Sequence, residues 1–381
     1  MKSCGLYIHI PFCRSKCIYC DFFSGGASAA DWDLLVDALL NELEERKHEL
    51  KDLPDTLYIG GGTPSLIQVD AFRRLIDGIY DKIGGRKQWN EFTIEVNPDD
   101  VTEEKCALWL EAGVNRVSMG VQSFVDSELN AIRRRHNADC AEKSLHVLKK
   151  HFHNISIDLM FGLPGQTADS WYESVGKAIE INPEHISAYS LMFEDGTPIS
   201  VMKNLGRLFF PSDDECVEMW KSLSRRLKMS GYSQYEISNY SKPGYESVHN
   251  SRYWLGFPYL GIGPSAHSYD GGGVRRANPS DLKGYLRRFS SNNVECSPFY
   301  IEETLETEEL IEEMLLTRMR MRSGVSLSEF EMRFGIKEKE RLLGNAREYI
   351  RNDMVAIDNG RLRLTDDGIM IADEIILGLT M

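Results

Sequence analysis

The chain has 381 residues, of which 42% are hydrophobic and 27% are charged, and its formal net charge is −14. This composition is typical of a globular protein, and the length predicts one large domain with a smaller one beside it. The acidic balance argues against a nucleic-acid-binding surface, which needs clustered Lys and Arg. No apolar run reaches the ~18–20 residues that a membrane helix needs, so we do not expect an integral membrane protein.

Cysteine usage indicates a reducing compartment. The chain has eight cysteines, three of them close together and five scattered. The first five residues do not begin a secretory signal, because a strand-like run starts immediately after them. A disulfide scaffold would need an oxidising environment, so we expect a cytoplasmic protein.

The first predicted element is a short apolar strand over residues 6–10, which ends at Pro11. Three cysteines follow in the next loop with C-x3-C-x2-C spacing: Cys13, Cys17 and Cys20. This spacing lets one tight loop turn three thiolates toward a common point, as an iron–sulfur cluster requires. Three cysteines leave one iron of a four-iron cluster without a protein ligand, and an open metal position usually binds a further molecule.

The spacing alone leaves other interpretations open. A structural zinc site normally has four ligands and pairs two C-x2-C motifs. His9 would be a candidate fourth ligand, but strand geometry points it away from the cysteine loop. A disulfide would leave one of the three cysteines unpaired.

A glycine-rich turn follows the second strand. A helix is predicted over residues 31–50 with Asp31 as its N-cap, and the second strand over 56–59. The strand leads into the sequence GGGTPS at residues 60–65. Three glycines allow backbone N–H groups to approach a ligand closely, although most such triplets are merely tight turns.

Four further strands, separated by helices, complete a predicted core. Six strands that alternate with helices predict right-handed crossovers and a parallel sheet. Six units are fewer than the eight of a closed barrel, so we expect an α/β fold that forms an open, three-quarter (β/α)6 barrel. The later strands are predicted at 92–96, 116–122, 155–160 and 185–191, and the helices after the glycine-rich turn at 67–83, 102–112, 139–152 and 170–181.

Polar side chains occur where these buried strands run or end. Glu95 and Asp158 lie within otherwise apolar strands, and Gln122 ends the fourth strand. A buried carboxylate needs a partner, so these positions are candidate ligand contacts; the alternative is a solvent-facing residue. Arg134 belongs to a basic run at residues 133–136, which could equally be a solvated surface.

The segment from Tyr7 to Cys20, Tyr-x-His-Ile-Pro-Phe-Cys-x3-Cys-x-Tyr-Cys, resembles the radical S-adenosylmethionine (SAM) superfamily, in its oxygen-independent coproporphyrinogen oxidase-like branch. The resemblance implies a [4Fe-4S] cluster on the three cysteines, with SAM on the remaining iron, and a core over residues 1–200. It also implies a set of SAM-binding residues, which are Tyr7, Gly61, Gly62, Thr63, Glu95, Gln122, Arg134 and Asp158.

Residues 249–254 read H-N-x2-Y-W, which resembles the signature of HemW-type heme chaperones. The resemblance implies that His249 binds heme, since neutral imidazole is a common axial ligand, and that Tyr253 and Trp254 flank the macrocycle. The alternatives are a hydrogen-bonded structural histidine and an aromatic pair that closes the outer wall. The motif lies in an expected extension of the core over residues 201–300.

Residues 301–381 are predicted to form a small winged-helix-like domain. The pattern indicates helices at 304–321, 326–334 and 338–352, a hairpin that turns at Asn359 and Gly360, and a closing helix capped by Thr365. Winged-helix domains often bind DNA, but this segment has 11 Lys and Arg against 18 Asp and Glu, which opposes phosphate binding. A lid or a partner surface is the better interpretation.

Two functions follow from the resemblance. A heme chaperone would pass heme to acceptor hemoproteins, membrane-associated respiratory proteins among them, whereas an oxygen-independent coproporphyrinogen III dehydrogenase would decarboxylate its substrate by radical chemistry. Asp21 and Phe22 follow Cys20 where the enzyme branch has Cys-x-Cys, and only six residues precede Tyr7 where that branch has a long extension. Together with H-N-x2-Y-W, these features favour the chaperone over the enzyme.

Overall fold

The computed structural model describes residues 4–26, 28–50, 52–290 and 297–380. Six parallel strands form the centre of one large sheet, and they pair in chain order, as predicted. The strands are β1 (Gly5–Ile10), β2 (Thr56–Gly61), β3 (Glu91–Val96), β4 (Arg116–Gln122), β5 (Ile155–Phe161) and β6 (His185–Ser190).

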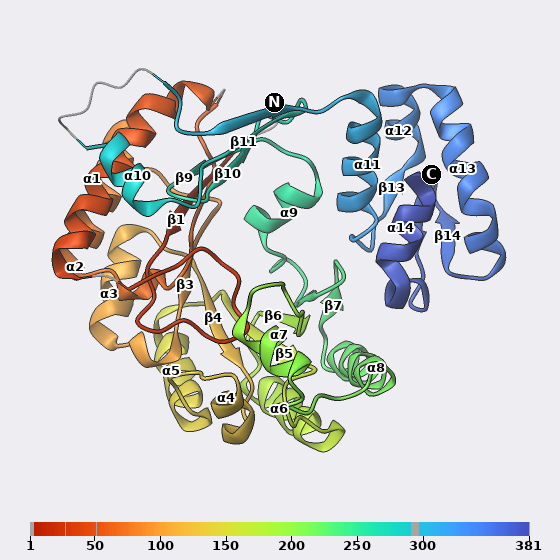
Figure 1. The fold of residues 1–381 in the computed structure, drawn as a ribbon, viewed down its shortest axis with the longest axis horizontal. Coiled ribbons are helices and arrows are strands. Elements are labelled where there is room, and N and C mark those ends of the chain that lie inside the picture. Colours follow the sequence, from red (N-terminus) through yellow and green to blue (C-terminus); the bar gives the residue numbers. More distant parts are fainter. Residues whose placement is uncertain (1–3, 27, 51, 291–296, 381) are drawn as a thin grey trace.

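Helices lie on the outer side of these strands (Figure 1). They follow the strands in the alternating order that a right-handed parallel sheet requires. The helices are α1 (Ala29–Arg46), α2 (Val69–Lys82), α3 (Glu103–Ala112), α4 (Asp126–Ala131), α5 (Ala138–His151) and α6 (Ala168–Ile181).

Side-chain alternation along β1 shows how the sequence divides the two faces of the sheet. Leu6, Ile8 and Ile10 are at most 1% exposed and belong to the apolar cluster that includes Leu35 of α1. The intervening side chains point to the opposite face, because successive strand residues alternate. That second face carries the candidate functional residues.

Residues between the core and the C-terminal segment lengthen the sheet at both edges. On one side β8 pairs antiparallel with β6, and on the other β9 pairs parallel with β1. The added elements are α7 (Pro198–Asn204), α8 (Asp213–Met229), β7 (Ser233–Gln234), β8 (Asn239–Ser241), α9 (Val248–Trp254), β9 (Tyr259–Ile262), β10 (His267–Tyr269), β11 (Val274–Ala277), α10 (Leu282–Arg288) and β12 (Ile301–Thr304).

The complete sheet has 12 strands in the order β12-β11-β10-β9-β1-β2-β3-β4-β5-β6-β8-β7. Within the described residues, β12 and β7 remain unpaired edges, so the sheet does not close. The predicted open α/β barrel is therefore confirmed. Strand β12 takes residues 301–304 into this sheet, although the sequence placed them in the last domain.

The C-terminal segment combines helices with a small antiparallel sheet in the order β13-β15-β14. Asn359 and Gly360 turn the predicted hairpin with positive φ angles of 48° and 73°. The elements are α11 (Thr307–Arg318), β13 (Val325–Ser326), α12 (Leu327–Phe334), α13 (Ile336–Arg351), β14 (Val355–Asp358), β15 (Arg361–Leu364) and α14 (Ala372–Thr380).

Backbone hydrogen bonds attach this segment to the extension of the core. The N–H of Ile237 donates to the carbonyl of Arg320, and the N–H of Arg322 donates to that of Tyr235, each at 3.0 Å. Arg318 also donates to the carbonyl of Leu255, which closes α9. Among the described helices, none combines the length and apolar character that a membrane crossing requires.

Several of the predicted helix starts are wrong, including that of the closing helix α14, which begins at Ala372 rather than directly after Thr365. Helix α1 begins at Ala29 with Ser28 as its N-cap, and the carboxylate of Asp31 accepts hydrogen bonds from the Ser28 N–H and hydroxyl. Asp31 therefore completes a capping box rather than capping the helix itself. The helix predicted from residue 304 begins at Thr307, because the preceding residues pair as a strand.

Candidate cluster and cofactor site

A cavity of about 510 Å³ opens where the parallel strands end. The cysteine loop forms one wall, and the carboxyl ends of β2, β3, β4 and β5 form much of the rest, as in barrel enzymes generally. The predicted residues that line it are Cys13, Cys17, Cys20, Gly61, Gly62, Thr63, Glu95, Gln122, Arg134 and Asp158. Tyr7 and His249, which were also predicted, lie elsewhere.

The cysteine loop is fastened at its base by backbone hydrogen bonds. The N–H of Cys13 donates to the carbonyl of Gly25, and the N–H of Gly25 donates to that of Pro11, both at 2.8 Å. Two polar side chains reach the thiols: the Thr63 hydroxyl lies 3.4 Å from the sulfur of Cys13, and Arg134 Nη1 lies 3.6 Å from that of Cys17.

The three thiols suit a multinuclear cluster better than a single ion. All three are free and partly exposed to the same cavity. In the part of the chain that the structure describes, no three His, Cys, Asp or Glu side chains converge closely enough for one metal ion. In a cubane each cysteine binds a different iron, so the sulfurs need not meet at one point. Three free thiols on one loop that line one cavity are the donor set that a [4Fe-4S] cluster takes.

The glycine-rich turn works differently from the expectation. Its N–H groups do not face a ligand: that of Gly61 donates to Glu95, that of Gly62 to the carbonyl of Ile10, and that of Thr63 to the carbonyl of Phe12. Glycine is needed for close packing instead. A Cβ on Gly61, whose φ is +111°, would lie 2.6 Å from the ring of His9. The turn thus locks the second strand against the cysteine loop.

Two half-buried carboxyl groups face the cavity from β3 and β5, which lie on either side of β4. Glu95 accepts a hydrogen bond of 2.7 Å from the Tyr58 hydroxyl, and burial raises the pKa of Glu95 to about 7. Burial likewise raises the pKa of Asp158 to about 6. A nearby cation would favour the ionised forms of both groups. This pair therefore suits a positively charged ligand.

Of the three consecutive arginines, Arg134 is the one held against the cysteine loop. Its guanidinium donates to the side-chain oxygen of Asn97 at 2.6 Å and to the carbonyl of Gly120, besides reaching Cys17. Arg135 also lines the cavity but pairs with Asp99 and Asp100.

Gln122 lies at a bulge in β4 with a φ of 69°. Bulges commonly re-aim side chains beside functional sites.

Sequence reasoning missed several residues of this cavity. Asn97, Ser118 and Tyr189 line it from the ends of β3, β4 and β6. Ser118 could have been found, because it precedes Gln122 by four residues and so shares its face of the strand. Tyr189 carried no comparable signal, since a tyrosine is common in strands.

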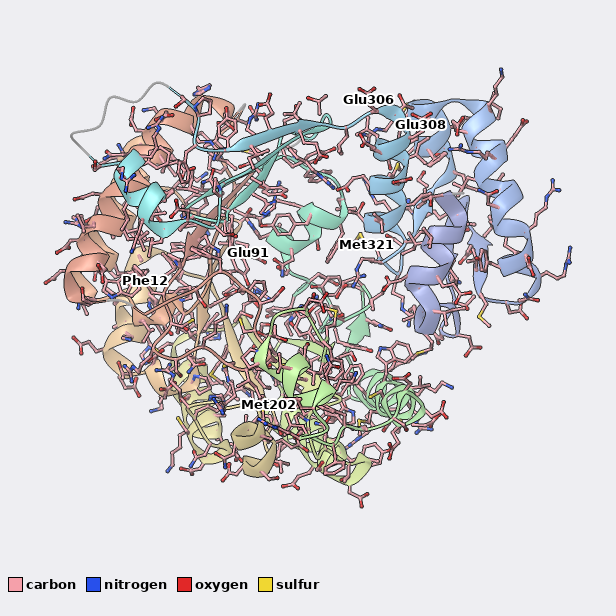
Figure 2. The ribbon with its side chains drawn as sticks, in the orientation of Figure 1. Phe12, Glu91, Met202, Glu306, Glu308 and Met321 are labelled. Carbon is pink, nitrogen blue, oxygen red and sulfur yellow. The ribbon has the colours of Figure 1, made fainter. Side chains whose placement is uncertain are left out.

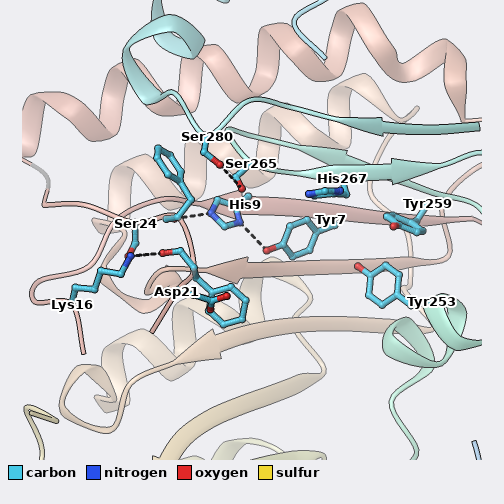
Figure 3. Close-up of a pocket in the computed structure, with 12 residues that line it drawn as sticks. Tyr7, His9, Lys16, Asp21, Ser24, Tyr253, Tyr259, Ser265, His267 and Ser280 are labelled. Carbon is cyan, nitrogen blue, oxygen red and sulfur yellow. Dashed lines mark hydrogen bonds between the residues drawn. The ribbon is translucent and has the colours of Figure 1, made fainter. Parts of the chain in front are cut away.

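A second cavity, of about 560 Å³, adjoins the first and contains Tyr7 (Figure 3). His9 Nε2 donates a hydrogen bond of 3.1 Å to the carbonyl of Phe23, and His9 Nδ1 is hydrogen-bonded to the Tyr7 hydroxyl at 3.0 Å. Tyr7 therefore lies outside the first cavity, which holds the three cysteines and the other seven predicted SAM-binding residues. The remaining lining comes from residues 16, 21–24, 253, 259, 265, 267 and 280.

His249 lies at the opposite end of β2 from the cysteine loop, beside Thr56 at the start of the strand. Its ring is 1% exposed, with Nδ1 2.8 Å from the Thr56 hydroxyl and Nε2 2.9 Å from the Tyr253 hydroxyl. Burial lowers the pKa of His249 to about 3, so the ring is neutral. Both nitrogens are engaged inside the protein, which is the structural alternative that the sequence left open. Its role as a heme ligand stays a prediction.

Glu91 explains why the H-N-x2-Y-W segment folds as helix α9. Its carboxylate accepts hydrogen bonds from the N–H groups of Val248 and His249 at 2.7 and 3.0 Å, and from the Ser247 hydroxyl at 3.2 Å. Figure 2 shows Glu91 between the core strands and α9. A carboxylate at a helix N-terminus satisfies N–H groups that have no partner within the helix.

Comparisons with known proteins agree with this arrangement. Residues 7–178 match the radical SAM superfamily, and residues 305–371 match the HemN C-terminal domain. The chain is 35% identical over 378 residues to the heme chaperone HemW of Bacillus subtilis, covering 98% of both chains. The chain belongs to the HemW family. It is also 34% identical over 375 residues to the heme chaperone HemW of Lactococcus lactis, covering 98% of this chain and 96% of that protein.

A solved structure supports the fold of the HemW-family chain. Coproporphyrinogen III oxidase (HemN) from Escherichia coli, a radical SAM enzyme, has a TM-score of 0.83 with this chain at 21% identity, over 100% of this chain and 90% of that one. At this identity the likeness shows the fold and not the activity. It extends through the C-terminal segment, so the whole architecture is shared.

Proposed function

We propose that the chain is a heme chaperone that binds heme and transfers it to acceptor hemoproteins. The observation that carries the proposal is similarity to proteins named heme chaperone HemW over 98% of the chain. The acidic C-terminal segment and the open sheet are compatible with a protein partner. We place this activity in the cytoplasm, with acceptors that include membrane-associated respiratory proteins.

The first cavity would hold the resident cofactors. Cys13, Cys17 and Cys20 would bind a [4Fe-4S] cluster, and the polar strand ends would hold SAM beside it. When bound, the reduced cluster and SAM supply one-electron chemistry. The family to which the chain belongs supports this assignment.

The chain's own residues would orient SAM and shield it. Glu95 and Asp158 supply two carboxylates for a ligand that carries a sulfonium charge, and Tyr58 holds Glu95 in place through its 2.7 Å hydrogen bond. Arg134 neutralises sulfur charge beside Cys17 and fixes the third strand's end through Asn97. Packing of the glycine-rich turn against the cysteine loop keeps both walls of the cavity together.

One side-by-side assay tests the proposal. Anaerobically reconstituted protein is titrated with ferric heme and, separately, incubated with coproporphyrinogen III, SAM and a reductant. We expect a stable Soret band with stoichiometric heme and no decarboxylated product. Turnover of coproporphyrinogen III without stable heme binding would establish the dehydrogenase instead, and Asp21-Phe22 after Cys20 would then be a poor discriminator.

A further inference from the structure

The second cavity has walls suited to a planar aromatic ligand. Tyr7, Tyr253 and Tyr259 contribute rings from β1, α9 and β9, and Phe22 adds a fourth from the cysteine loop. Its volume of about 560 Å³ falls within the range of about 300–1,000 Å³ typical of small-molecule sites. Aromatic side chains offer extended apolar contact together with a polar tip. The cavity thus has the volume and the aromatic lining that a macrocycle would need.

His267 presents an imidazole to this cavity. It lies on β10, it is exposed, and Figure 3 shows its ring beside that of Tyr7. No hydrogen bond to its ring nitrogens is found among the described residues. Partial burial and the nearby charge of Arg275 lower the pKa of His267, which keeps the ring neutral. A neutral imidazole with an available nitrogen is the form that binds iron.

The other two histidines near this cavity already have a hydrogen-bond partner on each ring nitrogen. His9 contacts the Tyr7 hydroxyl and the Phe23 carbonyl through its two nitrogens. His249 contacts Thr56 and Tyr253 in the same way and is buried behind the wall. Either would have to break internal hydrogen bonds before it could bind a metal.

We propose that the second cavity is the heme site and that His267 is its axial ligand. The proposal rests on the heme-chaperone function and names the site and ligand that this function requires. The H-N-x2-Y-W segment then acts indirectly. His249 is a positioning residue that holds the Tyr253 hydroxyl, while the Tyr253 ring packs edge-on against Tyr259 at 4.6 Å and forms the end of the cavity.

Polar groups at the opposite end suit the carboxylates of an iron porphyrin. Ser24, Ser265 and Ser280 bring hydroxyl groups, and Lys16 brings a positive charge near the opening. Asp21 lies at the same end and would disfavour a carboxylate beside it. The charges of Lys16 and Asp21 balance each other, so the serine hydroxyls are the groups that would donate hydrogen bonds to propionates at this end.

The heme would lie next to the cluster cavity without sharing its ligands. Lys16, Asp21 and Phe22 line both cavities, so the end of the cysteine loop separates them. The thiols of Cys13, Cys17 and Cys20 line only the first cavity. Heme and SAM can therefore occupy the protein together.

The test uses anaerobically reconstituted full-length protein, ferric heme as the probe, and difference spectra that subtract the cluster absorbance. His267→Ala should shift the Soret band and weaken heme binding at least tenfold, and added imidazole should restore the wild-type band. His267→Cys should give a band typical of thiolate-ligated heme. His146→Ala is the matched control on the surface of α5, and His249→Ala should leave the Soret position unchanged even if affinity falls.

Cluster absorbance and thermal melting establish that each variant is folded. An unshifted Soret band and unchanged affinity in His267→Ala, or loss of the axial signature in His249→Ala alone, would overturn His267 while leaving the chaperone function intact. Absence of heme binding by the wild type would instead overturn the proposed function, and this site with it. The two failures are thus distinguished by the wild-type titration.

Discussion

The two cavities lie on the same face of one sheet but differ in what lines them. The first gathers sulfur, carboxylate and guanidinium groups at the ends of the core strands, where charge is concentrated. The second gathers tyrosine rings and imidazole on β1 and the added strands β9 and β10. Extending a barrel sheet at one edge thus creates a second cavity with a lining chemistry different from that of the first.

Substitution of the cysteines should have the largest effect on the first cavity, because it should remove the cluster. Cys13→Ala, Cys17→Ala or Cys20→Ala should each abolish the [4Fe-4S] absorbance after reconstitution, because each removes one of three iron ligands. Cys140→Ala is the matched control, since Cys140 lies on α5 and is also a partly exposed free thiol. Loss of the cluster in Cys140→Ala would contradict the three-ligand assignment.

The sequence predicted the first cavity well because its signals are local. Each parallel strand ends at the same edge of the sheet, so Glu95, Gln122 and Asp158 could be brought together from strand order alone. The choice of Arg134 depended on the resemblance and gains support from its contact with Cys17. The expectation that the glycine N–H groups face a ligand was wrong, because their direction depends on how the cysteine loop packs.

The second cavity could not be predicted, because it depends on contacts distant in sequence. Strand β9 pairs with β1 more than 240 positions away, and only this pairing brings Tyr259 and His267 beside Tyr7. Residues 261–268 read GIGPSAHS, a short glycine-containing stretch with a histidine that gives no indication of its neighbours. The motif at residues 249–254 indicated His249 as a heme ligand. Its hydrogen bonds to Thr56 and Tyr253 could not be predicted from the sequence.

Stability should separate the two histidines. His249→Ala should lower the free energy of unfolding by about 2–4 kcal/mol, because it leaves a cavity and two hydroxyl groups without their partner. His267→Ala should change it by less than about 0.5 kcal/mol, since the ring is exposed. Denaturant unfolding of the reconstituted variants measures both. Equal losses would mean that His267 is as structural as His249.

Removing either half-buried carboxylate should weaken SAM binding while sparing the cluster. Glu95→Ala and Asp158→Ala should each raise the dissociation constant about tenfold or more, because a cationic ligand loses a carboxylate partner in a buried site. Calorimetry under anaerobic conditions gives the affinity, and iron analysis shows whether the cluster is intact. Wild-type affinity in both variants would remove these residues from the SAM site.

The pH dependence of SAM binding should be the mildest effect. In the free protein the pKa of Glu95 is about 7 and that of Asp158 about 6, and SAM favours their ionised forms. Affinity should therefore reach a plateau about one unit above pH 7, fall by up to about tenfold per unit between pH 7 and 6, and fall more steeply toward pH 5, where both carboxyl groups take up a proton. Glu95→Gln should flatten the upper part of this profile. An affinity that rises on acidification would contradict the assigned charges.

The position of the heme iron is the most direct test of whether heme binds in the second cavity. Crystals of the reconstituted protein loaded with ferric heme would be measured at the iron absorption edge, and an anomalous difference map would locate every iron. We predict one cluster peak among Cys13, Cys17 and Cys20, and a separate heme peak within bonding distance of a His267 ring nitrogen, between Tyr7 and Tyr259. A heme peak beside His249, or within the cysteine-lined cavity, would contradict it.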